Sequence, residues 1–452
     1  MKKNHKLENL VNFLKADNAP TALIEWFMFA YKEWERKLNE KIPLSKCAPI
    51  SPANIDHLSN INDQKLNRKG IKNLDKLAII KLNGGLGTSM GCSTAKSLLK
   101  INPTETFIDI IVSQINSINK QFNSNLNLIL MNSFYTDKET NKSILNKNIT
   151  TFLQSRIPRV NVSNDDMANN ENNINWCPPG HGNLYLSLNE SGLLDQLISS
   201  GKEYVFISNS DNLGATINTT IYGYLMENQA DFLMEVTPKT ILDKKGGSLV
   251  RKDNNYYLLE QAQVDNSEIK EFESIDKFSL FNTNNIWIHL ESLKKYLQNN
   301  QIQLPIIFNQ KQVDSKKYVQ FETAIGSAIS CFQNAQVLSV PRNRFLPVKK
   351  TTDLFLLQSN LFKKNRDGIL EKKEQHIALP EVVFDEHNLI ISEYTNHFKV
   401  IPNIENLNSI KIKGKIEFQE NVSLSGDVIL INQTDQTKVL KNIEISNQTI
   451  TF

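Results

Sequence analysis

The stretch Leu77-Ala-Ile-Ile-Lys-Leu-Asn-Gly-Gly-Leu-Gly-Thr-Ser-Met-Gly91, followed by Lys96-Ser97, decides the fold prediction for this 452-residue chain. Its first part, 77–82, is typical of a buried β-strand, and a glycine-rich loop follows. Glycines this dense let backbone N–H groups curl around an anion, because no side chain blocks the approach. The lysine beyond the loop adds a positive charge for phosphate. The stretch therefore predicts a nucleotide at the carboxyl end of a strand in an open α/β sheet.

The spacing of this loop fits neither of the common phosphate-binding motifs. The Walker pattern requires Gly-Lys-Ser/Thr in succession, and the dinucleotide fingerprint requires a tighter glycine triplet that opens a helix. The loop therefore indicates a nucleotide that is bound in another way.

Length and composition narrow the class of protein. A chain of 452 residues accommodates one large α/β domain and one or two smaller pieces. Hydrophobic residues make up 40% and charged residues 22%, as in ordinary globular proteins. The net charge of +3 is small and the lysines are scattered, which argues against a nucleic-acid partner.

Cysteine use and hydropathy predict the compartment. The four cysteines are far apart, without the paired spacing of zinc or redox sites, so we expect a reducing environment. No run approaches the roughly 20 apolar residues of a membrane span, and charges interrupt the N-terminal apolar pattern that a signal peptide would need. We therefore expect a cytoplasmic protein without a membrane partner.

The chain changes character along its length. Residues 1–70 have helical periodicity and predict an N-terminal helical segment. In 71–350, strands and helices alternate, which predicts one domain with a mostly parallel, mixed sheet covered by helices. The segment 351–400 connects this domain to the C-terminal part. The expected strands are 77–82, 126–131, 150–153, 204–208, 232–236 and 256–259, the expected helices include 107–118 and 193–199, and the asparagine-rich 164–175 is expected to be a loop.

The C-terminal segment 401–452 contains short runs in which apolar and polar residues alternate. The runs 410–418, 422–430 and 443–450 are separated by Gly, Asn or Asp. Such a pattern predicts a small parallel β-helix, whose open end could pair with a second copy of the chain. The alternative is a β-sandwich extension without a role in oligomerisation, because strand alternation alone fits both.

Polar clusters follow several of the predicted strands, where ligands bind in α/β sheets. Taken singly, each has an ordinary interpretation: Lys96 and Gln154 as surface residues, His181 as a structural histidine, and Asp211 as a turn residue. The clusters are Gln154-Ser-Arg156, Pro178-Pro-Gly-His-Gly182, Ser208 to Gly214, Lys245-Gly-Gly247, Glu260-Gln-Ala-Gln263, Phe281-Asn-Thr-Asn-Asn285 and Pro341 to Lys349.

Taken together and in order, these motifs resemble the eukaryotic-type UTP–glucose-1-phosphate uridylyltransferase (UDP-glucose pyrophosphorylase) family, from about residue 75 to 353. Ser93-Thr94-Ala95 departs from the Lys-Gly-Pro that many members carry, whereas the lysine that follows is retained as Lys96. The resemblance implies a Rossmann-like nucleotidyltransferase domain and a C-terminal parallel β-helix. The motifs that carry it are Lys81 to Gly91 with Lys96, Met131-Asn-Ser-Phe134, Pro178 to Gly182, Ser208 to Gly214, Phe281 to Asn285 and Arg344 to Lys349.

The resemblance also implies a reaction. Members of this family transfer UMP from UTP to glucose 1-phosphate by in-line, Mg²⁺-assisted displacement, forming UDP-glucose and pyrophosphate. Positioning and charge neutralisation carry such transfers, so no Ser-His-Asp or Cys-His arrangement is needed. Two alternatives stay open: a UDP-N-acetylhexosamine or broad UDP-sugar pyrophosphorylase, and a non-catalytic nucleotide-sugar sensor. The absence of an arginine after Gly87-Thr88 favours the glucose enzyme.

The resemblance finally implies roles for individual residues, while the sequence leaves open the oligomeric state, the use of other sugar 1-phosphates, and regulation. Lys96, His181 and Lys349 are the expected catalytic residues, Leu82, Asn83, Gly84, Gly85, Gln154 and Gly180 the nucleotide-binding residues, Asn209, Gly247, Glu260, Asn282 and Asn284 the sugar-binding residues, and Asp211 the ligand of Mg²⁺.

Overall fold

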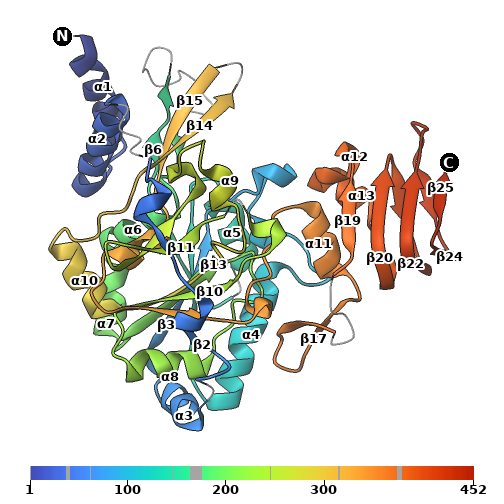
Figure 1. The fold of residues 1–452 in the computed structure, drawn as a ribbon, viewed down its shortest axis with the longest axis horizontal. Helices are drawn as coiled ribbons and strands as arrows, with labels where there is room; N and C mark the ends of the chain where they lie inside the picture. Colours follow the sequence, from blue (N-terminus) through green and yellow to red (C-terminus); the bar gives the residue numbers. More distant parts are fainter. Residues whose placement is uncertain are drawn as a thin grey trace. The chain divides into compact units, whose positions relative to one another are not determined.

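The computed structural model describes residues 2–36, 41–61, 63–145, 147–162, 176–244, 246–313, 316–373 and 379–452. The predicted loop 164–175 lies outside the described residues. The chain divides into two compact units. Unit 1 comprises Met1–Gly84, Ser124–Asn209 and Ile217–Arg342, and unit 2 comprises Gly85–Asn123, Ser210–Thr216 and Asn343–Phe452. Each unit is described by itself below (Figure 1).

Unit 1 is built on a large, mostly parallel sheet with the strand order β2-β16-β10-β13-β9-β3-β4-β5. Every neighbouring pair on this path is parallel except the two pairs that β13 makes. The predicted mixed α/β sheet is confirmed. The strands are β2 (Asp56–His57), β3 (Leu77–Asn83), β4 (Leu128–Asn132), β5 (Ile149–Leu153), β9 (Tyr204–Asn209), β10 (Phe232–Pro238), β13 (Leu280–His289) and β16 (Ala335–Ser339), with β1 (Ala48–Pro49), β11 (Ser248–Lys252) and β12 (Asn255–Leu259) branching from β13.

The central strand β3 is buried along its whole length, as its continuous apolar run predicts. One face of the sheet packs its aliphatic side chains against α6 (Leu184–Glu190), α7 (Leu193–Ser199) and α10 (Leu290–Gln298). The other face carries Phe206 and Trp287, which pack towards Tyr222 of α8. The burial of both faces explains why the strands are apolar rather than alternating.

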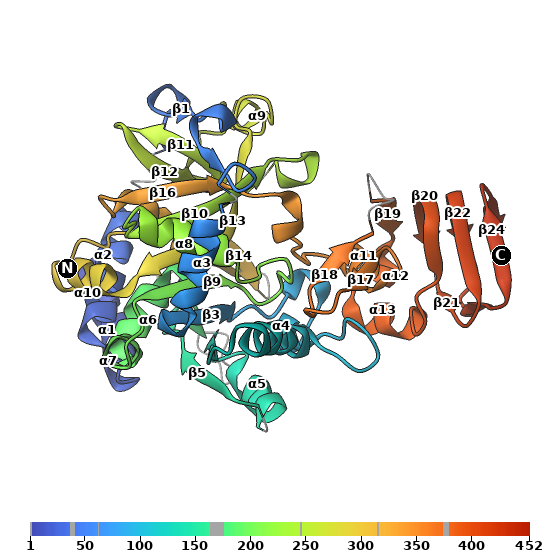
Figure 2. The same cartoon turned by 90° about the horizontal axis from the view of Figure 1, so that it is seen from below.

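Helix α3 (Gln64–Lys72) lies against α8 (Thr219–Glu227) on that second face (Figure 2). A Cβ atom on Gly70 would stand 1.9 Å from the carbonyl oxygen of Thr219, and a Cβ atom on Gly223 would stand 1.9 Å from that of Leu66. The two glycines therefore permit backbone contact between the helices.

A separate apolar cluster of unit 1 holds the N-terminal helices α1 (Lys2–Ala16) and α2 (Thr21–Glu35). Leu14 and Phe27 meet Phe321 in this cluster. The associated strands are β6 (Ile157–Pro158), β7 (Val160–Asn161), β8 (Trp176–Cys177), β14 (Ile307–Val313) and β15 (Lys316–Glu322), and unit 1 also includes α5 (Asp137–Ile144) and α9 (Ile269–Phe272).

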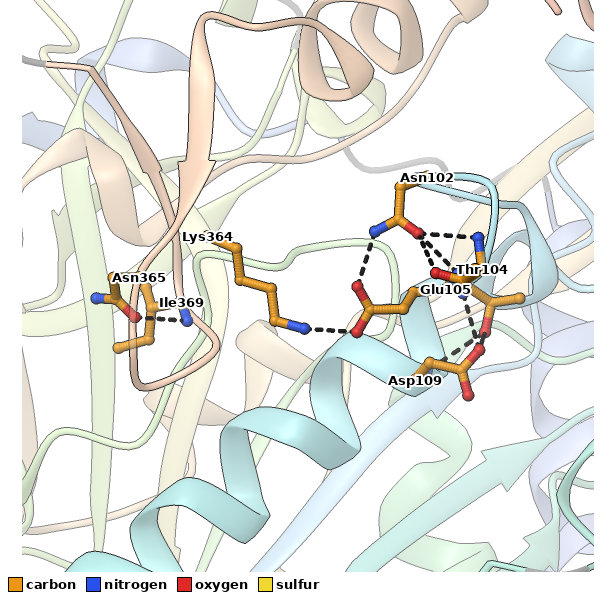
Figure 3. A network of polar contacts seen from close by, with 8 residues as sticks. Asn102, Thr104, Glu105, Asp109, Lys364, Asn365 and Ile369 are labelled. Atoms are coloured by element: carbon orange, nitrogen blue, oxygen red, sulfur yellow. Dashed lines mark hydrogen bonds and ion pairs between the residues drawn. The ribbon is translucent and has the colours of Figure 1, made fainter.

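Unit 2 begins with the glycine loop and contains α4 (Phe107–Phe122), whose first turn is closed by a capping box between Thr106 and Asp109. Figure 3 shows how Glu105 connects this helix start to Asn102 and to Lys364. The remaining elements before the C-terminal strands are α11 (Thr351–Gln358), β17 (Phe362–Lys364), β18 (Leu370–Lys372), α12 (Glu386–Leu389) and α13 (Ile391–His397).

The C-terminal strands of unit 2 pair in parallel throughout. β19, β20, β22 and β24 lie side by side in one sheet, and β21 pairs with β23 in another (Figure 2). None of the described helices is long and apolar enough to cross a membrane. The strands are β19 (Glu381–Phe384), β20 (Asn403–Lys413), β21 (Ile416–Phe418), β22 (Val422–Ile431), β23 (Lys438–Leu440), β24 (Ile443–Ser446) and β25 (Thr449–Thr451).

Candidate active site

The carboxyl ends of β3, β4 and β5 lie in register in unit 1, with Asn83 opposite Asn132 and Asn132 opposite Leu153. The buried Asn83 side chain donates to Asn132 Oδ1 at 2.8 Å and to Thr140 Oγ1 at 3.1 Å. The side-chain amide of Asn83 thus links the end of β3 to the end of β4. Leu82 precedes it in β3 and directs its side chain into the apolar cluster under α6 and α7.

Gln154 directly follows β5 and is buried, with 6% of its surface exposed, so it is not an ordinary surface residue. Its Nε2 donates to the carbonyl oxygen of Gly180. Its Oε1 lies where a Cβ atom on Gly84 would approach to 2.9 Å. The structure therefore brings together three of the predicted nucleotide-binding residues and fixes the glutamine amide between two glycines.

Gly180 is required by its surroundings. Its φ is +77°, and a Cβ atom would stand 2.4 Å from the carbonyl oxygen of Thr323. Gly85, the first residue of unit 2, has open space where a Cβ atom would be. The two glycines thus serve different purposes: one permits a tight turn, and the other leaves backbone uncovered.

His181 follows Gly180 and opens the 3₁₀ turn His181–Asn183. Its Nδ1 accepts a hydrogen bond from the backbone N–H of Ile325 at 3.1 Å. Because a backbone N–H only donates, this nitrogen is unprotonated and the ring proton lies on Nε2. Loss of hydration among the surrounding protein atoms acts in the same direction and lowers the pKa of His181 to about 4. His181 therefore presents a neutral Nε2–H donor.

The five predicted sugar-binding residues form one connected group in unit 1. Asn284 Nδ2 donates to Asn209 Oδ1 at 2.8 Å, and the Asn284 backbone N–H donates to Asn282 Oδ1 at 2.9 Å. The Asn282 backbone N–H reaches the carbonyl oxygen of Gly247 at 3.4 Å. A Cβ atom on Gly247 would stand 2.6 Å from Glu260 Oε1. Four separate stretches of sequence thus converge on one place.

Asn284 is the unusual member of this group. It lies inside β13 with a φ of +60°, a left-handed conformation that asparagine tolerates better than most residues. Its Oδ1 is buried and has no hydrogen-bond partner among the residues that the structure describes. A buried acceptor without a partner lowers the stability of the fold, because it has lost its hydrogen bonds to water. A hydroxyl group of a ligand would restore such a bond.

Unit 2 holds the predicted phosphate and metal residues. Lys96 Nζ donates to Asp211 Oδ2 at 2.8 Å and to the carbonyl oxygen of Val348 at 2.9 Å. The side chains of the pair are 18% and 16% exposed. Because the ion pair is partly buried, Lys96 is not an ordinary surface lysine and Asp211 is not simply a turn residue. The lysine stem lies against the glycine loop, since a Cβ atom on Gly87 would stand 2.7 Å from Lys96 Cγ.

Lys349 has an exposed side chain on a backbone that is fixed at both ends. Its N–H donates to Asp353 Oδ2 at 2.8 Å, and its carbonyl oxygen accepts from Ser89 Oγ in the glycine loop at 3.1 Å. The buried Asn212 ties its own loop to the same segment, accepting from the N–H of Leu346 at 2.8 Å and donating to the carbonyl of Arg344 at 3.2 Å. The sequence prediction missed both Ser89 and Asn212.

Asp211 is the residue of unit 2 that the sequence predicts as a metal ligand. Across the described part of the chain there is no group of three or more His, Cys, Asp or Glu side chains that could hold a metal ion. Mg²⁺ needs few protein ligands, because it commonly binds one or two carboxylates and completes its shell with water and substrate phosphates. The hard oxygen ligands of Asp211 fit such an ion.

These features define a class: an α/β protein with a nucleotide-type glycine loop at the end of the central strand of a mostly parallel sheet. Comparison with known proteins is more specific. The sequence profile described as UTP–glucose-1-phosphate uridylyltransferase matches residues 24–425. The enzyme of that name from Musa acuminata is 44% identical over 366 residues, covering 79% of this chain and 78% of the relative. A second one from Dictyostelium discoideum is 41% identical, covering 83% and 77%.

Solved structures agree with this result. The UDP-glucose phosphorylase of Trypanosoma brucei superposes with a TM-score of 0.88 at 32% identity, over 99% of this chain and 100% of that one. The UDP-glucose pyrophosphorylase of Leishmania major, known in open and closed structures, also gives 0.88, at 30% identity over 99% of each chain. The chain belongs to the UTP–glucose-1-phosphate uridylyltransferase family.

Proposed function

We propose that this protein is a nucleotidyltransferase that joins glucose 1-phosphate to UTP, forming UDP-glucose and pyrophosphate. A phosphate oxygen of glucose 1-phosphate bonds to the α-phosphorus of UTP. The bond from that phosphorus to the bridging oxygen of the β-phosphate breaks, and the electron pair leaves with pyrophosphate. Family membership supports this substrate pair. Little covalent chemistry falls to the protein, so positioning and charge neutralisation carry the rate.

The observation that carries the proposal is the ion pair between Lys96 and Asp211 beside the glycine loop. The two residues are 115 positions apart in the sequence, yet they meet in an ion pair, and the lysine stem lies against Gly87 of the loop. A substrate phosphate can take the place of Asp211 as the acceptor for Lys96. A divalent cation can take the place of Lys96 beside the Asp211 carboxylate. Lys96 would then offset charge that builds on the leaving pyrophosphate.

Asp211 is the proposed ligand of Mg²⁺. The ion, when bound, supplies Lewis-acid stabilisation of phosphate charge. The chain's own part is to hold the carboxylate in place, which the hydrogen bonds of the neighbouring Asn212 support.

His181 and Lys349 are proposed to bind phosphate. The neutral His181 ring offers its Nε2–H as a donor, because the N–H of Ile325 occupies the other nitrogen. Lys349 offers an exposed positive charge on a fixed backbone, which suits a group that binds a phosphate.

The uracil and sugar roles follow from two groups in unit 1. The amide of Gln154, held at Gly180, is proposed to pair with the base, with Leu82, Asn83 and Gly84 forming the neighbouring backbone. Gly85, the next residue of the chain, is also proposed to bind the nucleotide with its backbone. The unpartnered Oδ1 of Asn284 is proposed to accept from a sugar hydroxyl. Asn209, Asn282, Gly247 and Glu260 would complete the same shell.

We also propose roles for the chain's segments. Residues 71–350 carry catalysis, 1–70 form a helical support, 351–400 connect, and 401–452 form a short parallel β-helix. Support for the β-helix comes from strands that alternate between two parallel sheets, with a repeat of about 20 residues. Its terminal strand is a candidate for pairing with a second copy, which would give a homo-oligomer. The four free cysteines agree with a cytoplasmic location.

The first experiment is pyrophosphate release by the purified protein with UTP, Mg²⁺ and glucose 1-phosphate, with other nucleotides and sugar phosphates in parallel. We expect release only with UTP and glucose 1-phosphate together, and loss of release when EDTA removes the metal. Faster turnover of N-acetylglucosamine 1-phosphate would instead indicate the acetylated-sugar enzyme. Tight UTP binding without release from any pair would indicate a nucleotide-sugar sensor.

A further inference from the structure

Glu235 is the one acidic residue of the apolar run Phe232–Val236 in β10, and its side chain is fully buried. Both carboxylate oxygens accept hydrogen bonds from β13. Oε1 accepts from the indole Nε1–H of Trp287 at 2.9 Å, and Oε2 accepts from Nδ2 of Asn285 at 3.0 Å. A carboxylate is suited to this place because it accepts on both oxygens and donates on neither.

The backbone of the same residue also binds a side chain of the bulge opposite it. The register between β10 and β13 passes from Met234–Ile286 to Val236–Asn282, so Glu235 alone faces Thr283, Asn284 and Asn285. The carbonyl oxygen of Glu235 accepts from Thr283 Oγ1 at 2.7 Å. Glu235 therefore contacts two residues of this β-bulge, Thr283 and Asn285, and its carboxylate also binds Trp287 just beyond the bulge.

The bulge determines where the proposed sugar-binding asparagines point. It places Asn284 in its left-handed conformation, with Nδ2 on Asn209 and a buried Oδ1 that has no partner among the described residues. It also sets Asn282, whose Oδ1 accepts from the N–H of Asn284. Bulges of this kind commonly re-aim side chains at functional sites. Any shift of the bulge would move both amides.

We infer that Glu235 is a positioning residue for sugar recognition, which acts by holding the β13 bulge that presents Asn282 and Asn284. The inference rests on the proposed function, since it takes these asparagines as the sugar shell. It assigns no role in nucleotide binding to Glu235, because the residues around Gln154 are held by separate contacts at the ends of β3, β4 and β5.

The test is the isosteric variant Glu235→Gln. A glutamine offers one oxygen and one NH₂ group, so either Asn285 or Trp287 faces a donor instead of an acceptor. We expect the KM for glucose 1-phosphate to rise about tenfold or more, while the KM for UTP stays within about twofold. The ratio of kcat/KM for glucose 1-phosphate to that for galactose 1-phosphate should fall. Glu227→Gln, at an exposed glutamate of α8, is the matched control.

A donor–acceptor exchange makes the test specific. In Glu235→Gln/Asn285→Asp, the new amide at position 235 donates to the new carboxylate at position 285, and the remaining oxygen accepts from Trp287. The total charge is unchanged, which matters beside the buried Lys81, whose amine lies 5.6 Å from the centroid of the Phe206 ring on this face. We expect the KM for glucose 1-phosphate to return to within about threefold of the wild-type value.

The outcomes separate the inference from the proposed function. An active wild type whose Glu235→Gln variant keeps its sugar KM, or loses sugar and UTP affinity equally, would overturn the inference alone. A wild type without activity towards UTP and glucose 1-phosphate would overturn both. If Glu235→Gln does not fold, Trp287→Phe keeps ring packing on Phe206 and removes one bond to the carboxylate. A sugar KM unchanged in that variant would equally count against the inference.

Discussion

Two adjacent lysines, Lys349 and Lys350, show how the structure distinguishes residues that look equivalent in sequence. Both side chains are exposed, and both backbone N–H groups donate to Asp353. Only the carbonyl of Lys349 also accepts from Ser89, a residue of the glycine loop. Its Cα is thus fixed by two partners in unit 2.

We predict that Lys349→Met lowers kcat/KM by about 10²- to 10³-fold, the usual cost of removing one group that stabilises developing charge. Lys350→Met should stay within about threefold of the wild type. Steady-state kinetics with UTP and glucose 1-phosphate would measure both, and thermal melts would show that both variants fold. Equal losses in the two variants would refute the assignment of the phosphate role to Lys349.

At the scale of elements, the start of α4 illustrates how a helix is anchored in unit 2. Asn102 Oδ1 accepts from the backbone N–H groups of Thr104 and Glu105, and its Nδ2 donates to the Glu105 carboxylate. Lys364 of β17 donates to the same carboxylate (Figure 3). The hydrogen bond from Lys364, followed by that from Asn102, lowers the pKa of Glu105 below its ordinary value.

This direction predicts a pH-dependent contribution to stability. Because the pKa of Glu105 is lower in the folded protein, its contribution is present above the ordinary glutamate pKa of about 4.3 and is lost as the pH falls through the folded value. The pair is partly exposed, so we expect Glu105→Gln to cost about 1 kcal/mol or less at pH 7 and less than that near pH 3. Denaturant titrations at both pH values would measure it, with the exposed Glu444→Gln as control. A cost that grows towards acid pH would contradict the sign.

At the scale of the whole molecule, unit 2 is assembled from three separate stretches of chain and includes Lys96, Asp211 and Lys349. An aromatic cluster joins its helices to the C-terminal strands, with the ring centroids of Phe398 and Phe418 5.2 Å apart. Phe418 is completely buried. The C-terminal strands therefore contribute to the stability of the unit that holds Lys96, Asp211 and Lys349.

We predict that Phe418→Ala destabilises unit 2 by about 3–5 kcal/mol, the usual cost of removing a buried phenylalanine ring. Proteolytic protection of 85–123 and 343–452 should be lost together, because the two stretches belong to one unit. Val439→Ala, at a partly exposed position in β23, is the control and should change little. Cleavage confined to the C-terminal strands would show instead that these fold independently.

Much of the molecule could be predicted from local patterns in the sequence. The run that became β3 is apolar enough to be a central strand, and the glycines after it permit both a close backbone approach and the left-handed turns at Gly87 and Gly91. The same holds for β9, β10 and the N-terminal helices. These elements are specified by neighbouring residues, so a single stretch of chain is sufficient to identify each one.

Other features depend on contacts that no local pattern encodes. The bulge in β13 requires Glu235 from another strand, although a lone acid in an apolar run was a visible signal. Asn212 was likewise visible beside Asp211, but its partners lie more than a hundred residues away.

By itself, the sequence determined the family, several of the central strands and the N-terminal helices, and the glycine loop after β3, because each depends on residues that are adjacent or regularly spaced. Only the tertiary structure decided that Lys96 meets Asp211, that Asn209 meets Asn284, and which ring nitrogen of His181 carries the proton. These are contacts between distant parts of the chain, and their geometry is set by how the strands pack rather than by the residues next to them.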